Sequence, residues 1–524
     1  MASRYHTVFL RTVGMAIKTP DSPADPSAGP TRGAYPIPLG SPTIAGFLGR
    51  TERGPLNEPV TVASFPEYCR YFGGYLADGA VARAVHDYFL HGGGRAVVVR
   101  VANRARRASI ALPTDGEPLE LHARYPGRQE VLRVSIDYEQ VENDPQLFNL
   151  VVQRVNAAGN RLIEDQEIYP LISTRETDAR FVGKVLGDSR LIALAGAVPP
   201  ARPLATPPER PGAPFRYVSM SAAGEDGDEL TDYDIIGSDR DGTGLFAFGR
   251  GPKIDLLALP LPPGRELGTT AFVAAARYCE QQRAVLIWDP PWSWQSVDAA
   301  MLGSRRLDLV HRSVMTYFPR IRPRGARARF AGGLPACGAI AGMLAARDRR
   351  GFFGRDEDAD YTLRAALTPV LSVSAVEAQR LARYGINAFV SATGGTNRLV
   401  GRVTLAATSL DRRRLRAFIL NSIEEAAREA ADDADLGNAL LRVEWQLRRF
   451  LEDLYRHGAL RGRTSGQAYF VETAGATAAS PPGLRFGFAL REPGRFAEFA
   501  VDLAGKRAGR MRPAATLEAE RSLR

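Results

Sequence analysis

The chain has 524 residues, of which 45% are hydrophobic, 24% charged and 8% aromatic. This balance is typical of a soluble globular protein and argues against a disordered or a membrane-spanning chain. The length predicts about three domains, because one hydrophobic core rarely grows beyond about 250–300 residues. The opening MASRYHTVFLRTVGMAIKTP has neither the apolar run of a secretory signal nor a spanning segment, so we expect synthesis in the cytoplasm.

The formal net charge of +10 is carried almost entirely by arginine, since only Lys18, Lys184, Lys253 and Lys506 are lysines. The arginines are spread along the chain among 58 acidic residues, and no basic stripe is interleaved with aromatic residues. A nucleic-acid-binding protein usually gathers its basic residues on one face. The pattern therefore favours acidic protein surfaces over nucleic acid as partners, and an Arg-rich nucleic-acid-binding protein is kept as a third hypothesis.

Residues 1–40 form an N-terminal arm and linker. The alternating stretch Tyr5 to Val13 predicts a strand, and the following DSPADPSAGPTRGAYPIPLG is too rich in Pro, Gly and Ser for a helix or an inner strand. Residues 41–102 then predict a strand, helical segments and a second apolar strand, RAVVVRV. Such strands suit a buried parallel sheet, so an α/β domain begins here.

Residues 103–215 predict a β-rich inserted domain, because short alternating strands (LRVSIDYE, FNLVVQRV, EIYPLIS) replace the earlier pattern. Apolar strands and helices resume over 216–395, in segments such as AVLIWDPP, RSVMTYFP and PACGAIAGMLAARD. We therefore predict one α/β domain, formed by 41–102 and 216–395, that is interrupted by another domain.

Residues 396–505 predict a C-terminal domain with two amphipathic helices followed by strands. The first helix is expected to begin with Asp411 as its N-cap, and the cluster Arg412, Arg413 and Arg414 opens it where the helix dipole disfavours cations. We interpret these arginines as solvated or as contacts to a partner. The second helix places apolar residues at three- and four-residue spacing on one face, with Gly458 as the expected C-cap; the apolar residues are Leu440, Val443, Leu447, Phe450, Leu451 and Leu454.

Three alternating strands follow these helices, in QAYFVET, LRFGFAL and FAEFAVDL, and residues 506–524 form a polar tail. Strand-forming sequence therefore lies near both ends of the chain. That arrangement permits the exchange of strands between subunits. The fold class predicted overall is α/β plus α+β.

Motifs for catalysis, metals and cofactors are nearly absent. No GxxxxGK[ST], HExxH or GxSxG sequence occurs, only six histidines are present, and Cys69, Cys279 and Cys337 are too far apart for a CxxC metal site. Asp289 follows the apolar run AVLIW, at a strand end where α/β enzymes often place catalytic groups. Because no base or nucleophile accompanies it, we prefer a turn residue before Pro290 and Pro291, and keep a hydrolase-like enzyme with a site near Asp289 as the alternative.

Several segments in order resemble the tail sheath proteins of contractile phages, R-type pyocins and extracellular contractile injection systems. They are FLGRTERGPLNEPVTVASFPEYCRYFGG, ARYCEQQRAVLIWDPP, PACGAIAGMLAARDRRGFF and, most specific, LLRVEWQLRRFLEDLYRHGALRGRTSGQAYFV. The resemblance runs from about residue 41 to 503 and is weakest across the insertion. The arm departs from the family's PGVY-type motif, because this chain has HTVFLRTVGMAI.

The resemblance implies a non-enzymatic subunit, without a cofactor or metal, of a tube that contracts to drive an inner tube through a target envelope. It implies a subtilisin-like α/β domain, an inserted outer domain and a C-terminal sheath domain completed by strands from neighbouring subunits. The residues implied in strand exchange are Tyr5, Val8, Leu10, Val13, Tyr469, Val471, Phe486, Phe488, Phe496, Phe499, Val501 and Leu503.

The implied partners are further copies of this chain, the inner tail tube protein, and baseplate and tail terminator proteins, with neither nucleic acid nor membrane insertion. Arg412, Arg413 and Arg416 are candidate contacts to the inner tube, and a solvated helix face is an equally good interpretation of them. After synthesis, the protein is expected to form part of a phage tail or an extracellular contractile particle.

Overall fold

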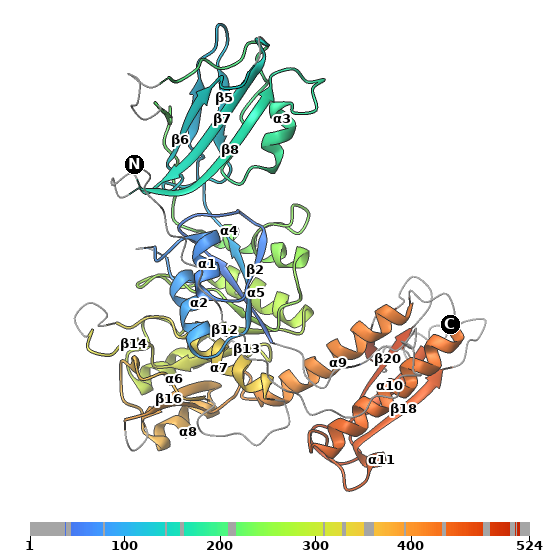
Figure 1. Cartoon of the computed structure of the whole chain (residues 1–524). Helices are drawn as coiled ribbons and strands as arrows, with labels where there is room; N and C mark the ends of the chain where they lie inside the picture. The colour runs from blue at the N-terminus through green and yellow to red at the C-terminus, as the bar shows by residue number, and fades with distance from the viewer. Residues whose placement is uncertain are drawn as a thin grey trace, which may run out of the picture.

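A computed structural model describes residues 37, 43–76, 79–141, 144–157, 162–207, 216–307, 310–326, 332–350, 361–391, 395–431, 436–474, 483–502, 509 and 511–513. They form an α/β domain in the middle of the molecule, a β-rich domain at one end and a helical and sheet domain at its side (Figure 1). Each region has its own buried apolar core. The fold is therefore mixed α/β with several separate sheets. The arm strand predicted at Tyr5 to Val13 lies outside the described residues.

The central domain is built on an eight-stranded sheet with the order β17-β16-β13-β12-β11-β1-β3-β2. The strands from β3 to β16 are parallel, and β2 and β17 pair antiparallel at the two edges. The strands are β1 (Ile44–Gly49), β2 (Pro59–Val62), β3 (Arg95–Arg100), β11 (Leu256–Ala258), β12 (Val285–Trp288), β13 (Val314–Phe318), β16 (Ile386–Ser391) and β17 (Asn397–Val400). A small separate antiparallel sheet is formed by β14 (Ile321–Pro323) and β15 (Leu367–Pro369).

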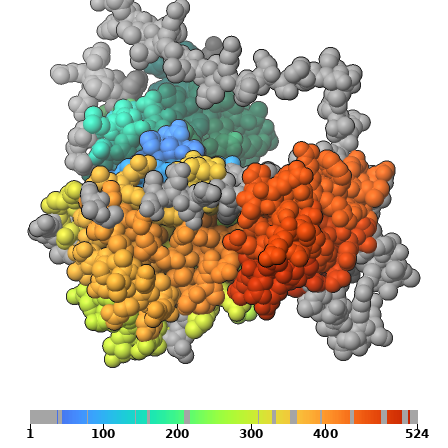
Figure 2. Space-filling model, turned by 90° about the horizontal axis from the view of Figure 1, so that it is seen from below, coloured from blue at the N-terminus to red at the C-terminus, as the bar shows by residue number. Residues whose placement is uncertain are grey.

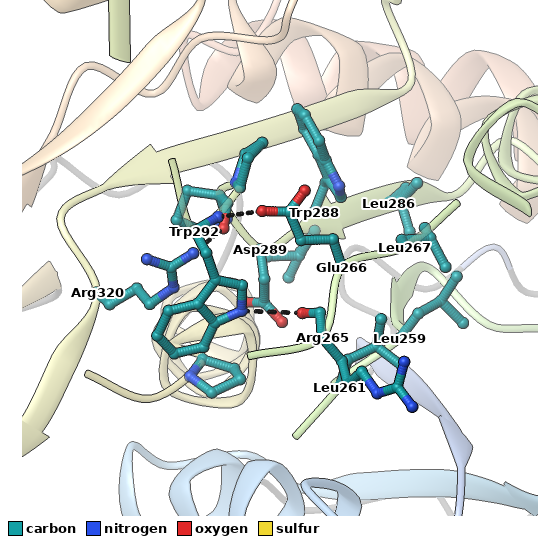
Figure 3. A pocket seen from close by; sticks show the side chains of 14 residues that line it. Leu259, Leu261, Arg265, Glu266, Leu267, Leu286, Trp288, Asp289, Trp292 and Arg320 are labelled. Carbon is teal, nitrogen blue, oxygen red and sulfur yellow. Dashed lines mark hydrogen bonds between the residues drawn. The ribbon is translucent and has the colours of Figure 1, made fainter. Parts of the chain in front are cut away.

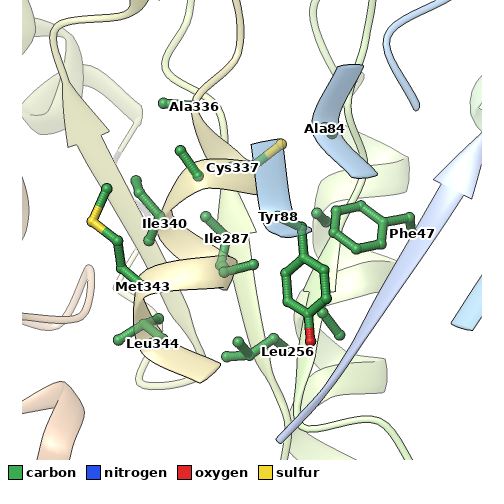
Figure 4. Close-up of a cluster of buried hydrophobic side chains, with 14 of the residues drawn as sticks. Phe47, Ala84, Tyr88, Leu256, Ile287, Ala336, Cys337, Ile340, Met343 and Leu344 are labelled. Atoms are coloured by element: carbon green, nitrogen blue, oxygen red, sulfur yellow. The ribbon is translucent and has the colours of Figure 1, made fainter. Parts of the chain in front are cut away.

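Helices cover both faces of this sheet, which is why its strands are apolar on both sides. One face packs against α1 (Phe65–Phe72), α2 (Val81–Leu90) and α7 (Cys337–Arg349). The other packs against α4 (Asp232–Ile236), η2 (Gly244–Arg250), α5 (Thr269–Gln281), α6 (Val297–Leu307) and α8 (Ala375–Arg383). Figure 4 shows the first of these cores, where Phe47, Tyr88 and Ile340 meet between α2, α7 and the sheet.

Glycines let α7 approach the backbone of α2 closely. A Cβ atom on Gly338 would lie 2.0 Å from the Ala84 carbonyl oxygen, and one on Gly342 would lie 2.4 Å from that of Tyr88. Helix α7 is therefore buried from Cys337 to Ala345, and Asp348 near its end is buried as well. The α/β sheet itself runs past the predicted boundary at residue 395, since β17 pairs with β16.

The inserted domain consists of two antiparallel sheets around a shared apolar core. One sheet contains β4 (Ser109–Leu112), β5 (Leu119–Ala123) and β9 (Ile192–Leu194); the other contains β6 (Leu132–Asp137), β7 (Leu147–Val155), β8 (Ile163–Ser173) and β10 (Val218–Ser219), and α3 (Val182–Val185) with η1 (Leu186–Asp188) closes one side. The three strands predicted from alternation correspond to β6, β7 and β8. Because β10 pairs with β6, this domain continues past residue 215.

The C-terminal domain packs two helices, α9 (Leu410–Ala431) and α10 (Leu436–Arg456), on an antiparallel sheet with the order β18-β19-β20-β21. The short α11 (Ser465–Ala468) leads into β18 (Tyr469–Ala474), β19 (Gly483–Phe488), β20 (Ala497–Asp502) and β21 (Met511–Pro513). The predicted apolar face of α10 is confirmed, with Leu440 partly buried and the other five residues buried. Gly458 has φ +76°, as a helix C-cap requires.

Two details of this domain differ from the prediction. The Ser409 hydroxyl, rather than Asp411, accepts a hydrogen bond from an N-terminal amide of α9, that of Arg412, at 3.3 Å. Asp411 lies in the first turn and pairs with Arg402 at 3.1 Å. The segment predicted as a polar tail contains β21, whose Arg512 pairs with Asp502 of β20 at 2.6 Å.

Candidate functional site

The outer edge of β18 is the main candidate for contact with another subunit, because β18 is the terminal strand of its sheet. The Ala489 amide donates to the Ala468 carbonyl at 2.8 Å, and the antiparallel register pairs Tyr469 with Phe488. Hydrogen-bonded pairs alternate along such a ladder. The backbone groups of Tyr469, Val471 and Thr473 therefore point away from β19. An edge of this kind can accept another strand.

Side chains of α10 run along this edge. The Arg448 guanidinium donates to the Val471 carbonyl at 2.6 Å and to the Glu444 carboxylate at 2.8 and 3.0 Å. The Thr473 hydroxyl donates to the same carboxylate, and this bond together with Arg448 holds the pKa of Glu444 below its usual range.

One turn further along α10, the Tyr469 hydroxyl donates to Glu452 at 2.9 Å. Partial burial, reinforced by this acceptor, raises the pKa of Tyr469 to about 12, so the phenol stays a donor at neutral pH. Glu444, Arg448 and Glu452 were missed from the sequence, because Glu and Arg four residues apart on a helix are typical of a solvated face.

Six of the twelve residues expected to take part in strand exchange lie in strands of this sheet. Val471, Phe486, Phe488, Phe499 and Val501 are buried and face the helices, and Tyr469 is half-buried beside them. Within the single chain, β20 pairs with β19, in the register Phe486 with Phe499 and Leu484 with Val501.

Phe496 lies apart from that cluster. It packs against Phe470 on the opposite face of the sheet, with ring centroids 5.1 Å apart. Tyr5, Val8, Leu10, Val13 and Leu503 lie outside the described residues.

The arginines considered for the inner tube do not share one surface. Arg412 is exposed, whereas Arg413 points toward the α/β domain and donates to the Ala284 carbonyl at 3.4 Å. Burial lowers the pKa of Arg413. Arg416 places its guanidinium 5.3 Å from the centroid of the Phe499 ring. Arg412 and Arg416 are the exposed members of the three and lie one turn apart on α9. On α10, Leu441 and Trp445 are also exposed, one turn apart.

Arg414 corrects the prediction that the arginines opening the first helix are solvated or face a partner. Its side chain is 6% exposed and forms an ion pair with Asp348, whose side chain is 2% exposed. The Thr43 hydroxyl, just before β1, donates to the same carboxylate. Asp348 holds the pKa of Arg414 above its usual range against the opposing effect of burial. The pair ties α9 to the end of α7 and to the start of the central sheet.

Further polar contacts join α9 to the α/β domain, and Figure 2 shows the red-orange C-terminal region packed beside that domain. Arg283 pairs with Glu424 and donates to the Asn421 side-chain oxygen at 3.1 Å. The Lys253 ammonium donates to the same oxygen at 2.9 Å. These contacts and the Arg414–Asp348 pair fix α9 against the α/β domain.

Asp289 lies at the carboxyl end of β12, in the wall of a small cavity that Arg265, Glu266, Trp292 and Arg320 also line (Figure 3). The Tyr317 hydroxyl donates to its Oδ1, and the first amide of α7, that of Cys337, donates to the same atom at 3.3 Å. Burial raises the pKa of Asp289 to about 6.

The polar groups around Asp289 serve to hold neighbouring elements together. Burial raises the pKa of the Cys337 thiol far above its usual range, so a thiolate nucleophile is not available there. The Arg320 guanidinium donates a hydrogen bond to the Pro290 carbonyl at 2.5 Å, and its central carbon lies 3.8 Å from the centroid of the Trp292 ring. Asp289 therefore joins β12, β13 and the start of α7, a role larger than the turn residue predicted.

Replacing Asp289 by asparagine should flatten the dependence of stability on pH. The folded protein keeps a proton on this carboxyl between pH 3.8 and about 6, where the unfolded chain has lost it, so its contribution to stability falls as the pH rises through that window. Urea unfolding measures the free energy of unfolding at pH 4 and at pH 7. The decrease between these two pH values should be smaller in Asp289→Asn than in the wild type by roughly 2–3 kcal/mol. The exposed Asp298→Asn serves as control, and an unchanged pH dependence in Asp289→Asn would contradict the assignment.

Within the described part of the chain, no group of three or more His, Cys, Asp or Glu side chains is arranged to hold a metal ion. No helix in the same residues is both long and apolar enough to cross a bilayer.

No protein-family model matches the sequence, and no curated protein is significantly similar to it. Solved structures do resemble the fold. A sheath tail protein of Listeria innocua aligns with a TM-score of 0.59 at 12% identity, covering 89% of this chain and 96% of its own. One of Desulfitobacterium hafniense aligns with a TM-score of 0.51 at 12% identity, covering 93% and 100%.

A third similar structure is the sheath complex, in its contracted state, of an extracellular contractile injection system called PVC. It aligns with a TM-score of 0.50 at 13% identity and covers 92% of this chain and 96% of its own. The likeness thus extends over the α/β, inserted and C-terminal regions together. Over about nine-tenths of its length, this chain has the fold of tail sheath proteins.

Proposed function

We propose that this chain is the structural subunit of a contractile tail sheath. Copies polymerise as a helical tube around an inner tail tube and contract to drive that tube through a target envelope. The observation that carries the proposal is the fold, which matches sheath proteins along almost the whole length of both chains. The buried, committed surroundings of Asp289 support a structural role over the alternative of a hydrolase.

The central domain corresponds, in this proposal, to the subtilisin-like domain of sheath proteins, and the inserted domain to their outer domain. The arm of one subunit, Tyr5 to Val13, adds to the outer edge of β18 in a neighbour. Each main-chain hydrogen bond formed there contributes about 1 kcal/mol net. The Pro- and Gly-rich residues between the arm and residue 40 act as a leash, so domains can rotate while the strands remain paired.

The segment Phe496 to Leu503 is the second shared element. In a single chain, β20 occupies the position beside β19. In the sheath, the same register is filled by the copy from a neighbouring subunit, as in other domain-swapped assemblies. Contraction then changes the packing between subunits while the shared sheets hold them together.

The other partners proposed are the inner tail tube protein and, at the two ends of the sheath, baseplate and tail terminator proteins. Each ring contacts the next through different surfaces of the subunit. Because such head-to-tail contacts do not close on themselves, they generate a helical tube. The sheath is assembled from subunits made in the cytoplasm and becomes part of a phage tail or an extracellular particle.

Electron microscopy of the purified full-length protein tests this function. Ribbed tubes of uniform diameter, with or without an inner tube present, are the expected result. Only discrete monomers or closed rings under all assembly conditions, including added inner tube protein, would count against a sheath.

Reversing the charge of Arg412 tests the contact with the inner tube. Because Arg412 is exposed on the first turn of α9, Arg412→Glu should leave the fold intact and weaken attachment to the tube about three- to tenfold. Co-sedimentation of sheath with preformed tube measures this. The exposed Arg277→Glu on α5 is the control, and equal attachment of both variants and the wild type would refute the contact.

A further inference from the structure

The outer edge of β18 carries a guanidinium at the place where an added strand must bond. Val471 is one of the residues whose backbone groups point outward, and its carbonyl oxygen accepts a hydrogen bond from Arg448 at 2.6 Å. A strand added to this edge needs that oxygen as an acceptor for one of its own amides. Arg448 therefore occupies a bonding position of the edge.

Arg448 is held in this position by its neighbours on α10. Two hydrogen bonds to Glu444 orient the guanidinium, and the Thr473 hydroxyl binds the same carboxylate. The helix and the edge strand are thus joined by one connected set of charge-assisted bonds. These bonds keep the outward carbonyl of Val471 capped in the free subunit.

The expected occupant of the edge is complementary to this set. Residues 1–20 contain Arg4, Arg11 and Lys18 and no acidic residue, whereas the carboxylate paired with Arg448 at the edge is that of Glu444. An arm that brings its own cations compensates Glu444 when Arg448 leaves the strand. An apolar strand without cations would displace Arg448 but leave the Glu444 carboxylate without a cationic partner.

We propose that Arg448 guards the β18 edge: it caps the Val471 carbonyl in the free subunit and is displaced when residues 5–13 of a second copy add as a strand. This inference rests on the proposed sheath function and assigns one residue the control of its pairing step. Natural proteins commonly protect exposed edges with charged side chains. The guard slows unwanted pairing and favours the correct arm.

Binding of a labelled synthetic peptide of residues 1–18 to the full-length protein tests the guard. Titrations are followed by fluorescence polarisation below the concentration at which the protein assembles. Losing the competing charge-assisted bond should make Arg448→Ala bind the peptide about tenfold more tightly than the wild type. Arg448→Met, which keeps the aliphatic stem, should do the same, so the result does not depend on one variant folding well.

Arg456→Ala is the matched control, because Arg456 pairs with Glu452 four residues before it on the same helix, at 2.9 Å. It should bind the peptide as the wild type does. Equal or weaker binding by both Arg448 variants would overturn the guard, even where the wild type forms tubes. Failure of the wild type to form tubes would instead count against the sheath function, and absence of any peptide binding would overturn both the guard and strand addition at this edge.

Discussion

Arg414→Ala is expected to lower the free energy of unfolding by about 3–5 kcal/mol, the usual cost of leaving one member of a buried ion pair without its partner. Among the residues that the structure describes, only the Thr43 hydroxyl would then donate a side-chain hydrogen bond to the Asp348 carboxylate. Urea unfolding at pH 7 measures the change.

Arg412→Ala, in the same turn of α9 but exposed, is the control and should change stability by less than about 0.5 kcal/mol. The double variant Arg414→Met with Asp348→Leu should recover much of the loss, because no charge is then left buried. If Arg414→Ala cost less than about 1 kcal/mol, the pair would not be the joint between α9 and the α/β domain that we infer.

Deletion of Met1 to Lys18 is expected to abolish assembly while leaving a folded subunit. The described cores of all the domains lie outside this segment, so circular dichroism and the thermal transition should be preserved. The deletion removes the strand that, in our proposal, a neighbour's β18 edge receives. Electron microscopy should show no tubes at concentrations where the wild type forms them.

A second variant separates the strand from its leash. Replacing residues 19–36 by a Gly/Ser sequence of the same length keeps the arm and its reach, so tubes should still form. Deletion of the residues after Arg495 should also abolish tubes, but it removes β20, whose Phe499 and Val501 are buried in the C-terminal core, so this variant should be destabilised as well. Tubes of normal appearance from the arm deletion would contradict strand exchange through the N-terminus.

The sequence was most informative where one physical pattern dominated. The strands of the central sheet, such as AVLIW, could be predicted because they are continuously apolar. They are apolar because helices bury both faces of the sheet. The face of α10 was predicted because Val443, Leu447 and Leu454 repeat with the helical period. These are local signals, and solved sheath tail proteins share the fold that they build.

Polar residues with distant partners were misjudged. Arg414 has the same sequence surroundings as the exposed Arg412, and its partner Asp348 lies on another helix far away in the chain. Strand β21 has only three residues and no alternation; Arg512 pairs there with Asp502. Arg448 forms an ordinary helical pair with Glu444, and only the fold brings the Val471 carbonyl to it. In each case the role of the arginine depends on a partner that lies on another helix or strand. The local sequence pattern does not reveal that partner.

A cryo-EM map of the assembled tube tests the account most directly, because it shows which chain lies beside Tyr469 to Ala474. We predict a strand from the N-terminus of a neighbouring subunit along this edge, with the Val471 carbonyl bonded to its backbone and Arg448 moved away. A tube in which the edge stays capped by Arg448, or is covered by the subunit's own arm, would contradict the claim that neighbours are joined by shared strands.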